Sequence, residues 1–126
     1  MSYNDYFPIE INNIDSLCVR QIPIEKDNSL RTMEACSTND VKKGDIVSYS
    51  YYMLWHDAVV MEVISDNTLI LAHYGIASLF HFKKIIKETV RFEENKSFGV
   101  YNYDGWNVYS PDEVVKRAES RIGEEK

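Results

Sequence analysis

Two apolar segments separated by a short polar turn dominate the pattern of the chain. Residues 57–64 (DAVVMEVI) and 68–74 (TLILAHY) are apolar at nearly every position, and Ser65-Asp66-Asn67 lies between them. This pattern predicts two strands joined as a β-hairpin. Because both alternating sets of side chains are apolar, we expect both faces of the sheet to be covered. Residues 45–52 (DIVSYSYY), rich in β-branched and aromatic side chains, predict a third strand.

A helix near the C-terminus is the clearest single element. Ser110 suits the N-cap, Pro111 the first helical position and Glu113 the carboxylate position of a capping box. One apolar stripe at helical spacing is formed by Val114, Val115, Ala118 and Ile122. Gly123 is a natural C-terminal stop.

Weaker strand patterns follow the hairpin in residues 89–94 (TVRFEE) and 98–106 (FGVYNYDGW). The predicted fold class is therefore α+β, an antiparallel sheet with an amphipathic C-terminal helix. We assign this domain to residues 41–126 and interpret residues 1–40 as an N-terminal extension laid against it.

The extension itself has less regular patterns. Residues 16–26 (SLCVRQIPIEK) alternate apolar and polar positions and predict an edge strand, because Pro23 cannot donate to a ladder. Residues 30–35 (LRTMEA) lie between polar, turn-rich breaks and predict a single helical turn.

Composition excludes several classes of protein. At 126 residues the chain can bury a core without disulfides, and a formal net charge of −6 argues against binding nucleic acid by neutralising phosphates. No apolar run reaches the length of a membrane span, the start lacks a signal peptide, and two cysteines make no disulfide framework. We expect a cytoplasmic protein. The histidine and cysteine spacings match no metal motif, so we expect neither metal nor cofactor.

His56 and His73 bracket the hairpin and are the candidate catalytic residues. A histidine in a strand is usually a structural residue, and this interpretation stays open for His56, His73 and His81. The alternative is that one histidine acts as a catalytic base whose tautomer is fixed by a second polar group. A symmetric hairpin places His73 opposite residue 59 or 60, about 10–13 Å from His56 at about 3.3 Å per residue. Contact therefore needs a bulge, an off-centre loop or strong twist.

The order of these motifs resembles the lecithin:retinol acyltransferase-like family (LRAT domain). Three matches lie in the strands: Gly44-Asp45-Ile46-Val47 is similar to the family's opening Gly-Asp strand, His56-Asp57-Ala58-Val59 to its His-x-Gly/Ala-aliphatic motif, and His73 to its second histidine. Residues 110–123 resemble the family's helix of the type SPEEVVERARSRLG. The resemblance covers roughly residues 41–126.

This resemblance implies a permuted papain-like fold and thiol catalysis in lipid metabolism, by an acyltransferase (transferase) or a phospholipase A (hydrolase). A cysteine thiolate attacks the acyl ester of a phospholipid, the first histidine (His56) is the base and the second (His73) orients it. Asp57 departs from the family pattern, and a nearby carboxylate favours the imidazolium form of His56.

The family's cysteine lies in an Asn-Cys-Glu-His-Phe motif beyond the helix, which we expect past Lys126. We therefore expect this chain to be a fragment lacking the cysteine helix and to be inactive alone. Cys18 and Cys36 lie upstream of both histidines, without the motif's neighbours or a clear cause of a lowered thiol pKa. Cys36 is a poor substitute for the nucleophile.

Two other interpretations stay open. One is a non-catalytic SH3-like binding module whose tyrosines and Trp55 line a peptide groove, and the other is an LRAT-like pseudoenzyme scaffold.

For a fragment we expect an apolar groove beside the histidines, lined by Val60, Leu71 and the helix stripe. Residues 1–40 or a second copy, in a homodimer, would cover it. A membrane surface would be reached through a segment outside this chain. We interpret the basic group Lys83, Lys84, Lys87 and Arg91 as a solvated face.

Overall fold

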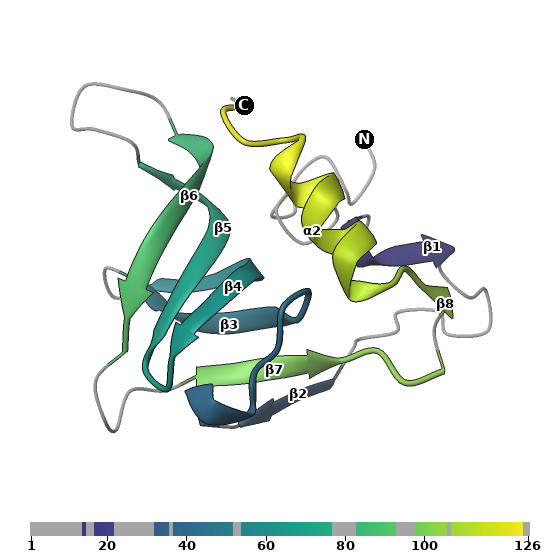
Figure 1. The fold of residues 1–126 in the computed structure, drawn as a ribbon, viewed down its shortest axis with the longest axis horizontal. Coiled ribbons are helices and arrows are strands. Elements are labelled where there is room, and N and C mark those ends of the chain that lie inside the picture. The colour runs from purple at the N-terminus through teal and green to yellow at the C-terminus, as the bar shows by residue number, and fades with distance from the viewer. Residues whose placement is uncertain are drawn as a thin grey trace.

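The computed structural model describes residues 14, 17–21, 32–35, 37–51, 54–76, 83–92, 98–105 and 107–124. Six strands form one sheet in the order β2-β7-β3-β4-β5-β6, and each neighbouring pair is antiparallel (Figure 1). These strands are β2 (Thr32–Ala35), β3 (Ile46–Tyr51), β4 (Leu54–Ser65), β5 (Thr68–Ile76), β6 (Lys83–Arg91) and β7 (Phe98–Asn102). The predicted α+β class, an antiparallel sheet with a C-terminal helix, is confirmed.

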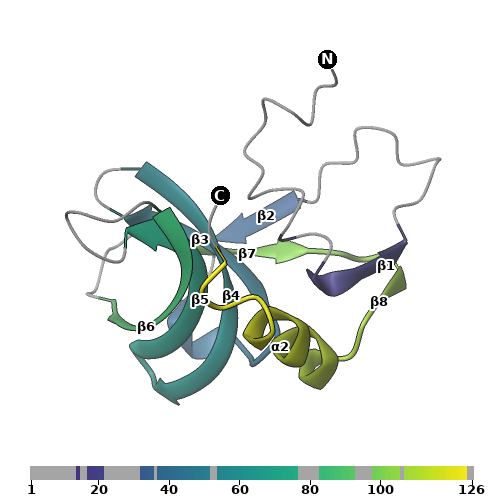
Figure 2. The same ribbon diagram turned by 90° about the horizontal axis from the view of Figure 1, so that it is seen from above.

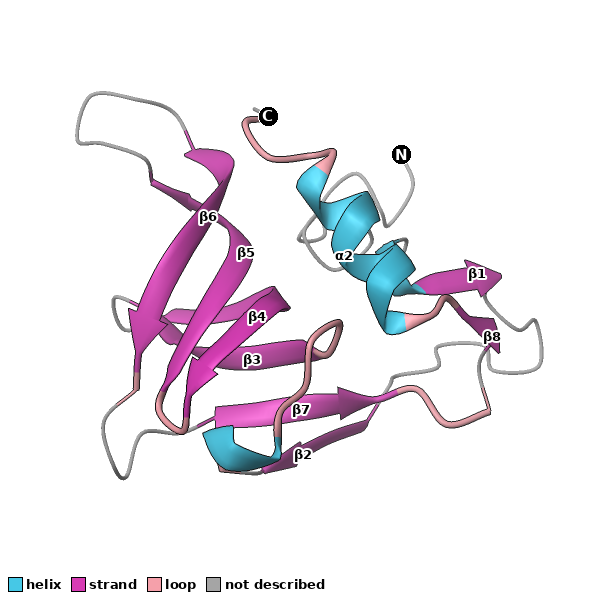
Figure 3. Cartoon of the chain, in the orientation of Figure 1, coloured by secondary structure: helices cyan, strands magenta, loops and turns pink. Residues whose placement is uncertain are grey.

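Four further elements lie in the described part of the chain (Figure 3). A short antiparallel ribbon is formed by β1 (Val19–Gln21) and β8 (Asn107–Val108). The 3-10 helix η3 (Thr38–Asp40) precedes the turn into β3, and the helix α2 (Pro111–Glu119) follows β8. α2 lies against one face of the sheet, next to β4 (Figure 2).

The sheet has an apolar core on each of its faces. The cluster towards α2 includes Ile46, Val59, Ala72, Val114 and Ala118. The cluster on the opposite face includes Val47, Tyr49, Ala58, Val60, Leu71 and Phe92. Neighbours such as Val59 and Val60 point to opposite faces, because side chains alternate along a strand. The expectation that both faces are covered, drawn from the continuous apolar segments, is correct.

The start of α2 agrees with the sequence prediction and its end does not. The Ser110 hydroxyl accepts the Glu113 N–H at 3.3 Å, and Pro111 occupies the first turn. Val114 and Ala118 of the predicted stripe are buried. The α-helix ends at Glu119, and a further turn leads to Gly123, whose φ of 92° is left-handed and whose N–H donates to the Ile85 carbonyl at 2.7 Å.

A tight turn at Lys42–Asp45 docks the entry of β3 on the start of α2. Gly44 has a φ of +91°, and a Cβ there would lie 2.7 Å from the Pro111 Cα. Only glycine meets both requirements, since it has no Cβ and enters left-handed conformations freely. An ion pair between Lys43 and Asp112, 2.6 Å from Nζ to Oδ1, bridges the same two segments.

The described residues before 41 are built into this fold. β2 pairs with β7 along Thr32–Ala35, so the helical turn predicted for residues 30–35 is wrong. The edge strand predicted within residues 16–26 is present as β1. The side chains of Ile14, Leu17 and Cys18 belong to the core towards α2.

Candidate functional site

His56 and His73 meet on the face of the sheet that points away from α2. His73 on β5 pairs with Ala58 on β4, and His56 precedes Ala58 by two residues, so both imidazoles project from the same face. Such diagonal neighbours stand about 7–8 Å apart between Cα atoms, within reach of ring side chains. The ring centroids are 5.9 Å apart, with an angle of 83° between the planes.

Two irregularities in the hairpin bring the histidines together. Register shifts occur between Val60 and Glu62 and between Val63 and Ser65, and each leaves one extra residue on β4. Each shift moves the partner of His73 by one residue, from residue 60 in a symmetric hairpin to Ala58. The contact therefore depends on bulges, one of the three conditions under which the histidine spacing allows it.

Glu88 on β6 holds the second histidine. His73 pairs with Ile86, so Glu88 is its diagonal neighbour on the same face, and His73 Nε2 lies 2.8 Å from Glu88 Oε1. His73 is only 2% exposed. Burial lowers the pKa of His73, while the hydrogen bond and the charge of Glu88 act in the opposite direction. Burial dominates, which favours a neutral imidazole.

Tyr49 on β3 forms the wall beside the histidines. It is the register partner of His56, its ring meets that of His73 edge-on at 6.1 Å between centroids, and it is 1% exposed. Phe92 packs against the same tyrosine ring at 5.4 Å, again edge-on. The side chain of Tyr49 is therefore buried at the site. Four adjacent strands, β3 to β6, thus contribute one polar or aromatic residue each.

Asp57 lies on the other face. Its Oδ1 accepts a hydrogen bond from the Tyr101 hydroxyl at 2.8 Å. The carboxylate that departs from the family pattern is therefore held by β7 on the α2 side of the sheet, and its chain neighbour His56 faces the opposite core.

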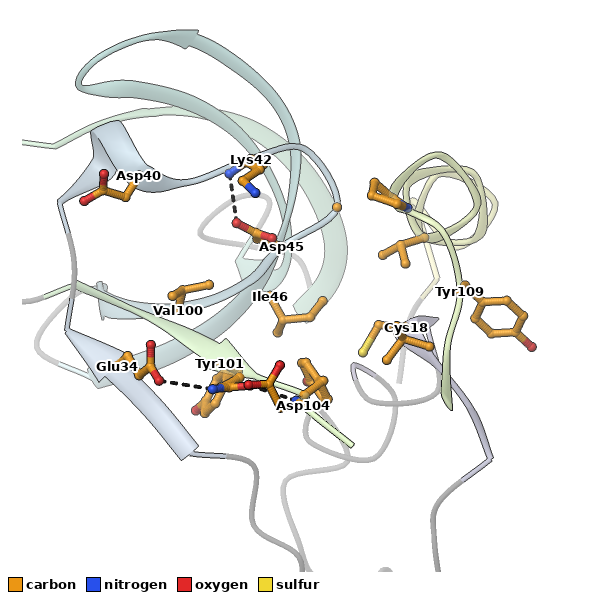
Figure 4. Close-up of a pocket in the computed structure, with 16 residues that line it drawn as sticks. Cys18, Glu34, Asp40, Lys42, Asp45, Ile46, Val100, Tyr101, Asp104 and Tyr109 are labelled. Atoms are coloured by element: carbon orange, nitrogen blue, oxygen red, sulfur yellow. Dashed lines mark hydrogen bonds between the residues drawn. The ribbon is translucent and has the colours of Figure 1, made fainter. Parts of the chain in front are cut away.

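Cys18 is separated from the histidines by the sheet. It is 4% exposed and packs in the core towards α2, beside a cleft of about 480 Å³ (Figure 4). Asp45, Ile46, Tyr101 and Pro111 also line this cleft. Cys18 therefore cannot reach His56 in this fold. Cys36 and His81 lie outside the described residues, as does the side chain of Trp55.

The groove expected beside the histidines is not formed by the residues named for it. Val60 and Leu71 are fully buried and face away from α2, whereas Val114 and Ala118 of the helix stripe pack on the opposite face. The prediction failed because it assumed that the helix covers the same face as the histidines.

Neither a metal-binding cluster nor a membrane-spanning helix is found in the part of the chain that the structure describes. The described residues contain no group of three or more histidine, cysteine, aspartate or glutamate side chains that could hold a metal ion. Within the same ranges, no helix is long and apolar enough to cross a membrane. Comparison of the chain with protein-family models, curated proteins and solved structures gave no match.

Proposed function

We propose that this chain carries the two histidines of an LRAT-type thiol acyltransferase or phospholipase A. The observation that supports the proposal is the adjacency of a half-buried His56 and a buried His73 fixed by Glu88. A half-buried imidazole can exchange protons with a substrate, and a buried one held by a carboxylate can orient it.

In this proposal, His56 takes the proton of a cysteine thiol, and the thiolate attacks the carbonyl carbon of a phospholipid acyl ester. The ester C–O bond breaks, the protonated His56 returns its proton to the departing lysophospholipid alcohol, and the acyl group remains as a thioester. Water or an acceptor alcohol or amine then attacks the thioester, with His56 removing its proton. The C–S bond of the thioester then breaks, the fatty acid or the acylated acceptor leaves, and His56 returns the proton to the sulfur to regenerate the thiol.

The thiol must reach His56 from the face opposite to α2, which Cys18 does not occupy. We assign this role to the Asn-Cys-Glu-His-Phe segment that the family resemblance expects beyond Lys126. A cysteine delivered from that segment would complete the site at the imidazole of His56.

The test compares residues 1–126 with a longer chain that continues through the next codons of the source gene. Both are incubated with phosphatidylcholine vesicles, and released fatty acid and lysophosphatidylcholine are measured. We expect turnover only by the longer chain, its loss in His56→Ala, and its retention in Cys18→Ala. Turnover by residues 1–126 that disappears in Cys36→Ala would overturn the proposal. A longer chain that carries the cysteine, folds and shows no turnover would favour the binding-module or scaffold interpretation.

A further inference from the structure

Glu88 contacts the candidate site but has no counterpart in the motifs that carry the family resemblance. Its side chain is 35% exposed on β6, while the His73 side chain that it contacts is fully buried. The contact runs diagonally between the adjacent strands β5 and β6, since the register partner of Glu88 is Leu71, two residues before His73. A carboxylate from an outer strand thus reaches the most enclosed imidazole of the site.

The chemistry of this contact determines which nitrogen of His73 carries the proton. An ionised carboxylate only accepts hydrogen bonds, so at 2.8 Å the Nε2 of His73 donates to Glu88 Oε1. A neutral imidazole has one N–H, which leaves the lone pair on Nδ1. That nitrogen is shielded from solvent. Among the described residues, His56 from β4, Tyr49 from β3 and Glu88 from β6 contact or lie beside His73 on this side of the sheet. Lys84 of β6 is the other diagonal neighbour of His73 on the same face.

A lone pair on His73 Nδ1 can accept the N–H of the His56 imidazole, directly or through one water, because the ring centroids are 5.9 Å apart. The second nitrogen of His56 then has its lone pair free for the proton of the attacking thiol. With the opposite tautomer, His73 would present an N–H and would repel the N–H of His56.

We infer that Glu88 is a positioning residue, which fixes the Nε2-protonated tautomer of His73 and so directs the basic nitrogen of His56 towards the nucleophile. This role rests on the proposed function, but the tautomer of His73 can be measured without any nucleophile. Removing the outer carboxylate or carbonyl partner of a metal-ligating imidazole typically costs roughly ten- to a hundredfold in activity, and we expect an effect of the same order here.

The experiment records the imidazole ¹⁵N shifts and their pH titration in residues 1–126, for the wild type, Glu88→Gln and Glu88→Ala. We expect wild-type His73 to be protonated at Nε2, and Glu88→Ala to lose this preference. In Glu88→Gln the amide can accept from one tautomer or donate to the other, so the preference should weaken. We also expect the His73 titration midpoint to move to lower pH in both, because the carboxylate that raises it is gone. Glu119→Gln is the matched control: it removes the 2.8 Å ion pair with the neighbouring Lys87, on the α2 face. It should leave His73 unchanged.

An unchanged tautomer and titration in Glu88→Ala would overturn the inference. Glu88→Gln, similar in size, keeps the test informative if the alanine variant folds poorly. In the longer chain, Glu88→Gln should lower kcat roughly ten- to a hundredfold with little change in KM. If the His73 tautomer changes in the Glu88 variants but His56→Ala leaves turnover intact, the proposed function fails and the positioning contact stands. If His56→Ala abolishes turnover but the His73 tautomer is the same in wild type and Glu88→Ala, only the positioning role fails.

Discussion

Gly44→Ala tests how closely the turn before β3 approaches α2. The new Cβ would lie 2.7 Å from the Pro111 Cα and 2.9 Å from its Cβ, at a φ of +91°. A left-handed conformation costs a non-glycine residue about 1–2 kcal/mol. Overpacking adds about 1–3 kcal/mol, because Pro111 begins a helix whose buried face cannot move freely. We expect a total loss of about 2–5 kcal/mol, a large share of the roughly 5–15 kcal/mol that stabilises a domain.

Gly123→Ala is the matched control. Its φ is +92°, and no atom lies within 4 Å of the added Cβ, so only the conformational cost of about 1–2 kcal/mol applies. The assay is urea unfolding followed by circular dichroism. For a small domain the free energy of unfolding falls by about 1–3 kcal/mol per M of urea. The extra loss in Gly44→Ala, about 1–3 kcal/mol, should lower the midpoint by roughly 1 M relative to Gly123→Ala. Equal losses in the two variants would refute the close approach.

Two further predictions concern pH. Because burial lowers the pKa of folded His73 below its ordinary 6.5, the unfolded state binds its proton first, and the wild type should lose stability relative to His73→Gln as pH falls below 6.5. Unfolding midpoints of the wild type and His73→Gln that change by the same amount from pH 8 to 5 would contradict this. Burial raises the pKa of Asp45 above 3.8, although the hydrogen bond from the Lys42 backbone N–H and the Lys42 charge act to lower it. Ionised Asp45 therefore costs stability at neutral pH. Asp45→Asn, which keeps an acceptor for that N–H, should be the more stable protein at pH 7, with the advantage vanishing below pH 3.8.

The elements that could be predicted from the sequence are those whose signals are local. The hairpin turn at Asp66-Asn67 and the helix start at Ser110-Pro111 depend on residues within one turn of each other. Residues 30–35 show the opposite case. Leu, Met, Glu and Ala favour a helix, yet pairing with β7 makes residues 32–35 a strand. Partners far apart in sequence decide strand formation, and a local pattern does not contain them.

The candidate site belongs to the second kind, because it depends on the count of bulges. With no bulge, His73 would lie opposite residue 60, on the face of His56 but about 13 Å along the strand. With one bulge it would pair with Val59, whose side chain points towards α2, and the two histidines would face opposite cores. Only the second shift returns His73 to the face of His56 and brings it diagonally beside that residue.

No glycine marks either bulge in the sequence, since the extra residues are Met61 and Ile64. Ile64 is 53% exposed and Val63 40%, which is unusual for such side chains in a strand that reads as buried throughout. That exposure accompanies the shifted register at the turn end of β4, where the strand stays paired with β5 and a bulge bends it locally. When both faces of a hairpin are apolar, the hydrophobic pattern fits either strand register equally well. The placement of His56 beside His73 therefore follows from tertiary structure and not from the sequence pattern.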